Sequence, residues 1–209
     1  IDLETAQMLK PIFLEIVMAP SFAPDALELL CTKKNLRVLK VDMSKDNTVR
    51  KQYVSMNGGM LVQDRDINTK PVSAEQCVTE SKPTAEQLAD LEFAWKIVKH
   101  VKSNAIVVAK NGMTYGVGAG QMNRIGSAEI ALKQAQATLK EEGKDIMTEG
   151  LVLASDGFFP FNDCVALAAE YGIKAIVQPG GSIRDEDSVK LADEKGITML
   201  FTGERHFKH

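Results

Sequence analysis

The chain has 209 residues, of which 44% are hydrophobic and 25% are charged, and its formal net charge is −3 at pH 7. This is the composition of a globular protein with enough chain for one large domain or two small lobes. It contains no basic block that would favour a nucleic-acid partner. No apolar run approaches the ~20 residues that a membrane-spanning helix needs.

The first 43 residues predict the order helix, strand, helix, strand. An apolar run at 15–20 ends in a proline, and Pro24 suits the first turn of the next helix. Residues 36–41 alternate between apolar and polar side chains, as a strand does. In chain order, the predicted elements are a helix at 4–9, a strand at 15–20, a helix at 24–34 and a strand at 36–41.

Residues 44–83 have a different character. They carry the turn-forming run Asn57-Gly58-Gly59, polar clusters, and the prolines Pro71 and Pro83. We therefore predict a connecting excursion with a short hairpin, and we place the boundary between two lobes inside it.

Residues 84–209 predict a complete α/β lobe. Thr84 and Gln87 form a capping-box pattern at the start of a helix, and Asn111-Gly112 is a strong hairpin signal between two strands. The predicted elements are a helix to about residue 101, strands at 104–110 and 113–120, a helix at 123–139, a strand at 151–154, a helix at 163–170, a strand at 174–178, a helix at 185–195 and a strand at 197–201.

A weak internal repeat connects the two parts. In both, an apolar strand (16–20 and 176–179) is stopped by proline and followed by a helix and a second strand (36–39 and 197–200). The chain thus resembles the tail of one α/β lobe followed by a complete second lobe. Chance similarity between two strand–helix–strand units stays open as the alternative. The sequence begins at Ile1 rather than Met, from which we expect a piece of a longer protein.

The segment 155–163 has the sequence Ser-Asp-Gly-Phe-Phe-Pro-Phe-Asn-Asp and follows a predicted strand. Open α/β sheets bind ligands at the carboxyl ends of their strands, so these aromatics predict a pocket for a flat, apolar group. The alternative is that they fill the end of the sheet as ordinary core.

Other residues near predicted strand ends have groups that could bind a polar or charged ligand. The glycine-rich segment 116–123 leads into a helix and is typical either of an anion site or of a tight turn. Arg124 in the first turn opposes the helix macrodipole, which favours a ligand role. Asn104 is suited to holding a carbonyl or an amine, or else simply caps its strand. Asp163 is suited to a ligand, or else caps the following helix.

The chain ends in Arg205-His206-Phe207-Lys208-His209, directly after a predicted strand. Arg205 could form bidentate hydrogen bonds to a phosphate or carboxylate. The alternative is a disordered tail. The three histidines have no spaced Cys or His partner for a metal, and the zinc-deaminase signature is absent. Cys31, Cys77 and Cys164 are scattered, which indicates reduced thiols and a cytoplasmic location.

Four segments together resemble the C-terminal half of AICAR transformylase, the formyltransferase part of a bifunctional purine-biosynthesis family that also carries IMP cyclohydrolase. The segments are 102–112, 118–125, 155–163 and 205–209, in that order and spacing. The resemblance implies a three-layer α/β/α, cytidine-deaminase-like lobe at 84–209, preceded by the end of a similar lobe at 1–43 and an excursion at 44–83.

The resemblance also implies an activity and a set of site residues. The family transfers a formyl group from 10-formyltetrahydrofolate to the 5-amino group of AICAR, usually as a homodimer. Asn104 matches a residue that contacts the AICAR carboxamide and supports catalysis. The positions matching AICAR contacts are Glu15, Arg124, Phe158, Arg205, Phe207 and His209. Those on the folate side are Ile125, Pro160, Phe161, Asp163, Ser182 and Ile183.

Several functional features of the family have no match in this sequence. None of its histidines matches the family's general base, which belongs to a Lys-His pair, and no segment matches the family's Arg-Tyr pair for the phosphate, its Ser-Ser-Phe-Gly segment or its cyclohydrolase domain. General acid–base catalysis typically contributes about 10²–10⁴-fold. We therefore expect the 209-residue chain to be inactive alone. A lobe that binds nucleotide or folate without chemistry, and a diverged deaminase-like scaffold that binds zinc, stay open as alternatives.

Overall fold

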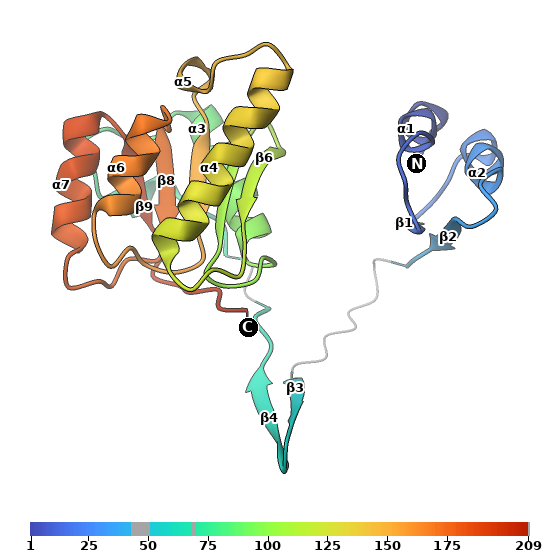
Figure 1. Ribbon diagram of the computed structural model, residues 1–209, viewed down its shortest axis with the longest axis horizontal. Coiled ribbons are helices and arrows are strands. Elements are labelled where there is room, and N and C mark those ends of the chain that lie inside the picture. Colours follow the sequence, from blue (N-terminus) through green and yellow to red (C-terminus); the bar gives the residue numbers. More distant parts are fainter. Residues whose placement is uncertain (43–50, 68–69, 209) are drawn as a thin grey trace. The chain divides into compact units, whose positions relative to one another are not determined.

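The computed structural model describes residues 1–42, 51–67 and 70–208. The chain divides into two compact units, Ile1–Ile67 and Asn68–His209 (Figure 1). The dividing point lies inside the predicted excursion at 44–83. Among the described residues, no helix is both long enough and apolar enough to cross a bilayer.

The first unit has the predicted strand–helix–strand order. A small core of Ala6, Val17, Ala26 and Leu30 holds its two helices to a pair of parallel strands. These elements are α1 (Leu3–Leu9), β1 (Ile16–Ala19), α2 (Pro24–Cys31) and β2 (Arg37–Lys40).

The predicted hairpin is also present in this unit. Strands β3 (Lys51–Met56) and β4 (Gly59–Asp64) pair antiparallel around Asn57 and Gly58, and Gly58 has the positive φ of 81° that such a turn requires. All residues of both strands are exposed, so this hairpin adds nothing to a core.

The second unit is built on a five-stranded sheet in the order β6-β5-β7-β8-β9. Strands β7, β8 and β9 are parallel, whereas β5 is antiparallel to both of its neighbours. The elements are a 3₁₀ turn η1 (Ala74–Gln76), α3 (Ala85–Val98), β5 (Ile106–Lys110), β6 (Met113–Gly118), α4 (Arg124–Glu141), α5 (Ile146–Glu149), β7 (Val152–Ser155), α6 (Asp163–Glu170), β8 (Ala175–Gln178), α7 (Asp185–Lys195) and β9 (Thr198–Phe201).

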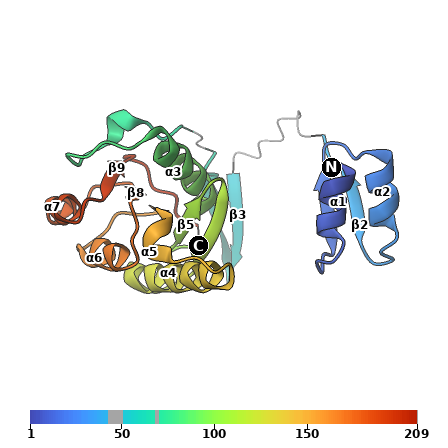
Figure 2. The same ribbon diagram turned by 90° about the horizontal axis from the view of Figure 1, so that it is seen from above.

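The sheet lies between two helical layers, which confirms the predicted α/β/α architecture. Figure 2 shows α3 on one side of the sheet and α4 and α6 on the other. Successive strand residues alternate between the layers, since Ile106 and Val108 pack with α4, α6 and α7, while Val107 and Ala109 pack with α3. Both faces of these strands are buried, so they appear in the sequence as continuous apolar runs.

Local signals explain where several elements begin and how closely they pack. The side chains of Thr84 and Gln87 each accept a bond from the other's backbone N–H, as predicted. Helix α4 lies directly on β6, because a Cβ on Gly118 would lie 1.9 Å from the Ser127 carbonyl oxygen. A Cβ on Gly116 would likewise lie 1.9 Å from the Ala131 carbonyl oxygen, so both glycines are required for the close packing of α4 on β6.

Some boundaries differ from the prediction. Helix α3 ends at Val98 rather than near 101, and β5 begins at Ile106 rather than at 104. Helix α5 was not predicted, because four residues are too short to show a helical period. It begins where Asp145 accepts a hydrogen bond from the Met147 N–H at 3.0 Å.

Candidate functional site

Most of the predicted site residues lie in loops that adjoin the strand ends at one edge of the sheet. Strands β7, β8 and β9 all end there. The start of β5 and the end of β6 lie there too, because Ile106 pairs with both Ser155 and Gly118. We call this the carboxyl edge. It is formed by residues 103–105, 119–124, 156–163, 179–184 and 202–208.

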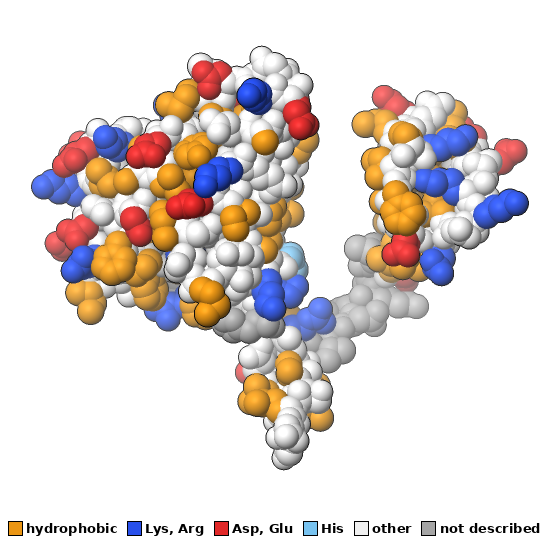
Figure 3. Space-filling view, in the orientation of Figure 1, with side chains coloured by type: hydrophobic (Ala, Val, Ile, Leu, Met, Phe, Trp, Pro, Cys, Tyr) orange, Lys and Arg blue, Asp and Glu red, His pale blue; other side chains and the backbone are white. Residues whose placement is uncertain are grey.

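The carboxyl edge presents apolar side chains to solvent. Figure 3 shows such side chains along the lower edge of the larger unit, below α4 and α6, interspersed with Lys and Arg. Large exposed apolar residues of these segments are Met122, Phe161, Ile183 and Phe207. Exposed apolar surface of this kind is typical of a binding site rather than of a solvated rim.

The residues of the aromatic segment differ in their burial. Phe159 is fully buried and belongs to the core with α4 and α6, so it fills the end of the sheet. Phe158 is half-buried, whereas Pro160 and Phe161 are exposed. The buried Phe159 thus agrees with the plug alternative, while a pocket at Phe158, Pro160 and Phe161 stays a prediction.

Two arginines lie over the outward-facing rings. The Arg205 guanidinium carbon is 4.9 Å from the centroid of Phe158, and the Arg184 carbon is 5.0 Å from that of Phe161. Both distances are those of cation–π contacts. The first contact joins two predicted AICAR residues. The second brings the 160–163 segment to the 182–184 turn, which were both predicted on the folate side.

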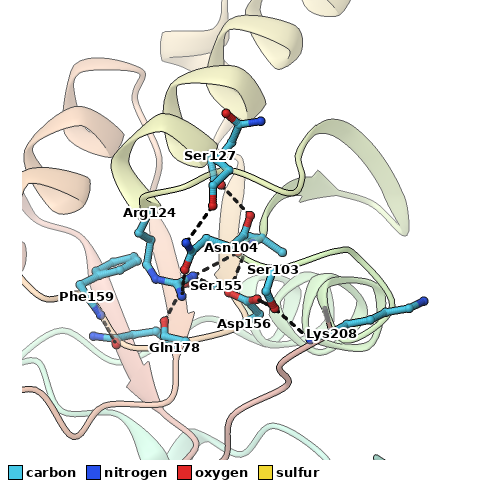
Figure 4. Close-up of polar contacts among 12 residues, drawn as sticks. Ser103, Asn104, Arg124, Ser127, Ser155, Asp156, Phe159, Gln178 and Lys208 are labelled. Carbon is cyan, nitrogen blue, oxygen red and sulfur yellow. Dashed lines mark hydrogen bonds and ion pairs between the residues drawn. The ribbon is translucent and has the colours of Figure 1, made fainter. Parts of the chain in front are cut away.

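Gln178, at the end of β8, holds these two segments in place. Its buried Oε1 accepts bonds from the Phe159 N–H at 3.1 Å and the Gly180 N–H at 3.2 Å (Figure 4). Gln178 was not predicted from the sequence. A glutamine that ends a wholly apolar strand was the available signal, because a buried amide must find partners.

The side chain of Asn104 is fixed from two directions. Its Nδ2 donates to the Gln121 carbonyl oxygen at 2.9 Å, and its Oδ1 accepts from Arg124 Nη2 at 2.8 Å (Figure 4). A primary amide offers two hydrogens and two lone pairs. These two bonds use one hydrogen and one lone pair of the half-buried Asn104 amide. The other hydrogen and the other lone pair are available to a ligand.

Arg124 points into the protein and forms an ion pair with Asp156. Arg124 is 7% exposed and Asp156 is fully buried. Arg124 Nη1 also donates to Ser155 Oγ at 2.9 Å. The charge that opposes the α4 macrodipole is therefore balanced inside the protein, while contact with AICAR stays a prediction. Asp156 was not predicted as a site residue from the sequence, although it is an acid next to the aromatic run.

The C-terminal segment is docked at residues 206–208, so the disordered-tail alternative is wrong for them. The Ser103 N–H donates to the Lys208 carbonyl at 2.8 Å, and the Lys208 N–H donates to Ser103 Oγ at 2.9 Å. The His206 N–H donates to the Asp156 carbonyl at 3.0 Å. Phe207 lies near Gly157, where an added Cβ would be 2.9 Å from its ring.

The remaining predicted folate residues lie on the same edge. Asp163 is the first residue of α6, and Asn162 occupies the N-cap position instead. The Asp163 carboxylate accepts from the Cys164 N–H at 2.8 Å. Ser182 Oγ accepts from the Arg184 N–H at 3.1 Å in a turn that leaves Ile183 fully exposed. Ile125 is half-buried and packs against the core beneath α4.

Two predicted residues are not placed at this edge. Glu15 is exposed in the first unit, where its carbonyl accepts from the Arg37 N–H at 3.0 Å. His209 lies outside the described residues.

The two described histidines, His100 and His206, line one cavity, and His206 also belongs to the carboxyl edge. The His206 ring lies 4.5 Å from the Trp95 ring, and both line a cavity of about 230 Å³ together with His100, Glu204 and three lysines. Within residues 1–42, 51–67 and 70–208, no group of three His, Cys, Asp or Glu side chains could hold a metal ion. The described edge offers amide, guanidinium and carboxylate groups and aromatic rings, which are suited to binding and orienting a ligand.

Cys164 is predicted to be an unreactive thiol despite its place beside Asp163. Burial, with a smaller contribution from the Asp163 charge, raises the pKa of the Cys164 thiol far above its usual range. At about pH 8 iodoacetamide should alkylate exposed Cys31 first and should reach Cys164 only after unfolding, because the thiolate is the nucleophile. Mass spectrometry of the labelled peptides measures this order. Alkylation of Cys164 in the folded chain at the rate of Cys31 would contradict it.

The comparisons with known proteins agree on one family. The family model described as "AICARFT/IMPCHase bienzyme" matches residues 1–134. A "Bifunctional purine biosynthesis protein PurH" from Anoxybacillus flavithermus is 56% identical over all 209 residues, which cover 39% of that protein. The protein of the same name from Lactobacillus delbrueckii subsp. bulgaricus is 56% identical and is covered to 40%. The chain thus spans about two fifths of the length of these relatives.

Likeness to solved structures is weaker. A deaminase/reductase of Thermotoga maritima, named diaminohydroxyphosphoribosylaminopyrimidine deaminase/5-amino-6-(5-phosphoribosylamino)uracil reductase, is 22% identical with a TM-score of 0.33, over 54% of this chain and 34% of that one. These values are too low to bear on function. The family is shown instead by a model match over more than half of the chain and by identity along its whole length: the chain belongs to the AICARFT/IMPCHase bienzyme family.

Proposed function

We propose that the chain is the C-terminal part of an AICAR transformylase of purine biosynthesis. In this role it helps to transfer the formyl group of 10-formyltetrahydrofolate to the 5-amino group of AICAR, which gives FAICAR. Family membership and the carboxyl edge both support the proposal. The observation that carries it is the amide of Asn104, which Gln121 and Arg124 hold in a fixed orientation at the carboxyl edge.

The amide of Asn104 is suited to a carboxamide ligand. Because Arg124 and Gln121 fix its plane, its remaining hydrogen and lone pair point in set directions. A carboxamide carries one acceptor and one donor group, which complement these two. A preorganised donor of this kind also stabilises charge that develops during an acyl transfer.

The 158–163 segment is suited to flat ring systems. Phe158, with Arg205 over its ring, offers an aromatic face and a cation beside the place of the nucleotide. Exposed Pro160 and Phe161 form an apolar wall for a pterin, and the Asp163 carboxylate can accept bonds from its aminopyrimidine edge. In this proposal Ser182 and Ile183 contact the folate from the neighbouring turn.

The rest of the reaction requires residues beyond this chain. We propose that a longer protein, of the length of the matched relatives, supplies the Lys-His pair and the other AICAR transformylase lobe, and acts as a cytoplasmic homodimer. We call it the complete protein. The purified 209-residue chain should then bind ligands but form FAICAR at least about 10²-fold more slowly than the complete protein.

A binding lobe without chemistry remains the second candidate, and it is favoured by the lack of a family-type general base among the residues of this sequence. The two candidates differ in one measurement. Formyl transfer by the complete protein, followed by the absorbance of the tetrahydrofolate product, supports the enzyme. AICAR and folate binding by calorimetry without turnover in the complete protein supports the binding lobe.

The folate side of the proposal is tested with Asp163→Ala in the complete protein. Loss of the carboxylate should raise the KM for 10-formyltetrahydrofolate about tenfold, since a hydrogen bond to a charged group contributes about 1.5 kcal/mol. The KM for AICAR should change less than twofold. The matched control is Asp145→Ala, which removes an equivalent N–H contact at the start of α5. Equal changes in both KM values would show that Asp163 is not a folate contact.

A further inference from the structure

Building on the role proposed for Asn104, we propose that Asp156 is a positioning residue for the Asn104 amide, and that Ser103 couples this positioning to docking of the C-terminal segment. Neither residue was selected from the sequence. Both lie in one hydrogen-bonded cluster at the carboxyl edge (Figure 4).

The Asp156 carboxylate is the centre of the cluster. It is fully buried and accepts bonds from Ser103 Oγ at 2.5 Å and the Ala105 N–H at 3.1 Å, in addition to its ion pair with Arg124. A buried carboxylate with three donors has little freedom to move. It therefore fixes the groups that donate to it.

Arg124 carries this constraint to Asn104. Its Nη1 bonds to Asp156 and its Nη2 bonds to Asn104 Oδ1. The guanidinium is planar and rigid, so holding one nitrogen fixes the direction in which the other donates. The amide plane of Asn104 is thus set by a carboxylate that it does not contact.

Ser103 connects the same carboxylate to the chain end. Its Oγ donates to Asp156 and accepts from the Lys208 N–H, while its own N–H donates to the Lys208 carbonyl. The docked segment carries Phe207 and follows Arg205, which both belong to the proposed AICAR site. The Ser103 hydroxyl group therefore contributes both to docking of the C-terminal segment and, through Asp156, to the orientation of Asn104.

The test is Ser103→Ala, which removes both hydroxyl bonds but leaves the ion pair. In the complete protein kcat for formyl transfer should fall about tenfold or more, because small misplacements of catalytic groups can cost up to ~10²-fold. Backbone amides of residues 206–208 should exchange hydrogen at least about tenfold faster, as followed by mass spectrometry. Ser103→Thr, which keeps the hydroxyl group, should restore both values.

The matched control is Ser188→Ala. Ser188 is fully buried in α7, and among the described residues its Oγ has no hydrogen-bond partner, so this variant tests the loss of a serine hydroxyl alone. Its kcat and exchange rates should stay within twofold of wild type. A kcat for Ser103→Ala within twofold of wild type, or an equal loss in Ser188→Ala, overturns the proposal.

One readout does not depend on the proposed function. In the 209-residue chain, the side-chain amide NMR signals of Asn104 should shift in Ser103→Ala and in Asp156→Asn but not in Ser188→Ala. If the complete wild-type protein transfers no formyl group, the proposed function fails, and the shift of these signals still supports the coupling. Unchanged Asn104 signals in both variants refute the coupling, whatever the activity.

Discussion

Asn104→Ala in the complete protein should lower kcat by about 10²–10³-fold, the typical loss when one preorganised donor is removed from a site of acyl transfer. The side chain is fixed by Gln121 and Arg124 and retains one donor and one acceptor for a ligand. Steady-state kinetics with both substrates measures the effect. Since the contact is proposed to strengthen in the transition state, kcat should fall more than KM rises.

Stability separates this catalytic loss from a folding defect. Asn104→Ala removes two hydrogen bonds of a half-buried side chain, at a cost of about 1–3 kcal/mol in total. The matched control is Asn123→Ala, which removes an amide on the same edge that caps α4 through a 2.8 Å bond from the Gly126 N–H. Losing such a cap costs about 1 kcal/mol and should leave kcat within a few fold of wild type. A comparable fall in kcat for both variants would contradict the role given to Asn104.

Arg124→Met should lower the free energy of unfolding by about 3–5 kcal/mol, because it leaves the buried Asp156 carboxylate without a countercharge. Urea unfolding of the 209-residue chain measures this loss. The Arg124–Asp156 pair is the most buried ion pair recorded for the described residues, with exposed fractions of 7% and 0%.

A surface cation on the same helix provides the control. Lys133 pairs with Glu129 at 3.5 Å, and both side chains are at least half exposed. Lys133→Met should therefore cost at most about 0.5 kcal/mol. Adding Asp156→Leu to Arg124→Met should recover part of the lost stability, since the unpaired charge is then gone. If Arg124→Met costs no more than Lys133→Met, the ion pair does not hold the edge together.

Much of the fold was predictable because the signals are local. The Asn111-Gly112 turn and the Thr84–Gln87 capping box each depend on neighbouring residues, and the structure confirms both. The three-layer arrangement, in contrast, was expected only from the family resemblance. Helix α5 escaped because four residues carry no periodicity.

The candidate site was predictable only in part. Asn104, Phe158 and Arg205 were selected because a polar or aromatic residue at a strand end is conspicuous in sequence, and the structure places all three at the carboxyl edge. Asp156 and Gln178 were not selected, since their partners are backbone and side-chain groups from distant segments. Nothing in the local sequence distinguishes a buried carboxylate with three donors from one in solvent.

The sequence by itself determined the order of most helices and strands and, through resemblance, the family. Periodicity, caps and turns operate over a few residues, so they can be recognised without coordinates. Only the tertiary structure decided that Phe159 is core while Phe161 is exposed, and that Arg124 points inward to Asp156. Those outcomes depend on which segments the sheet brings to one edge, because burial and charge pairing are properties of neighbours in space.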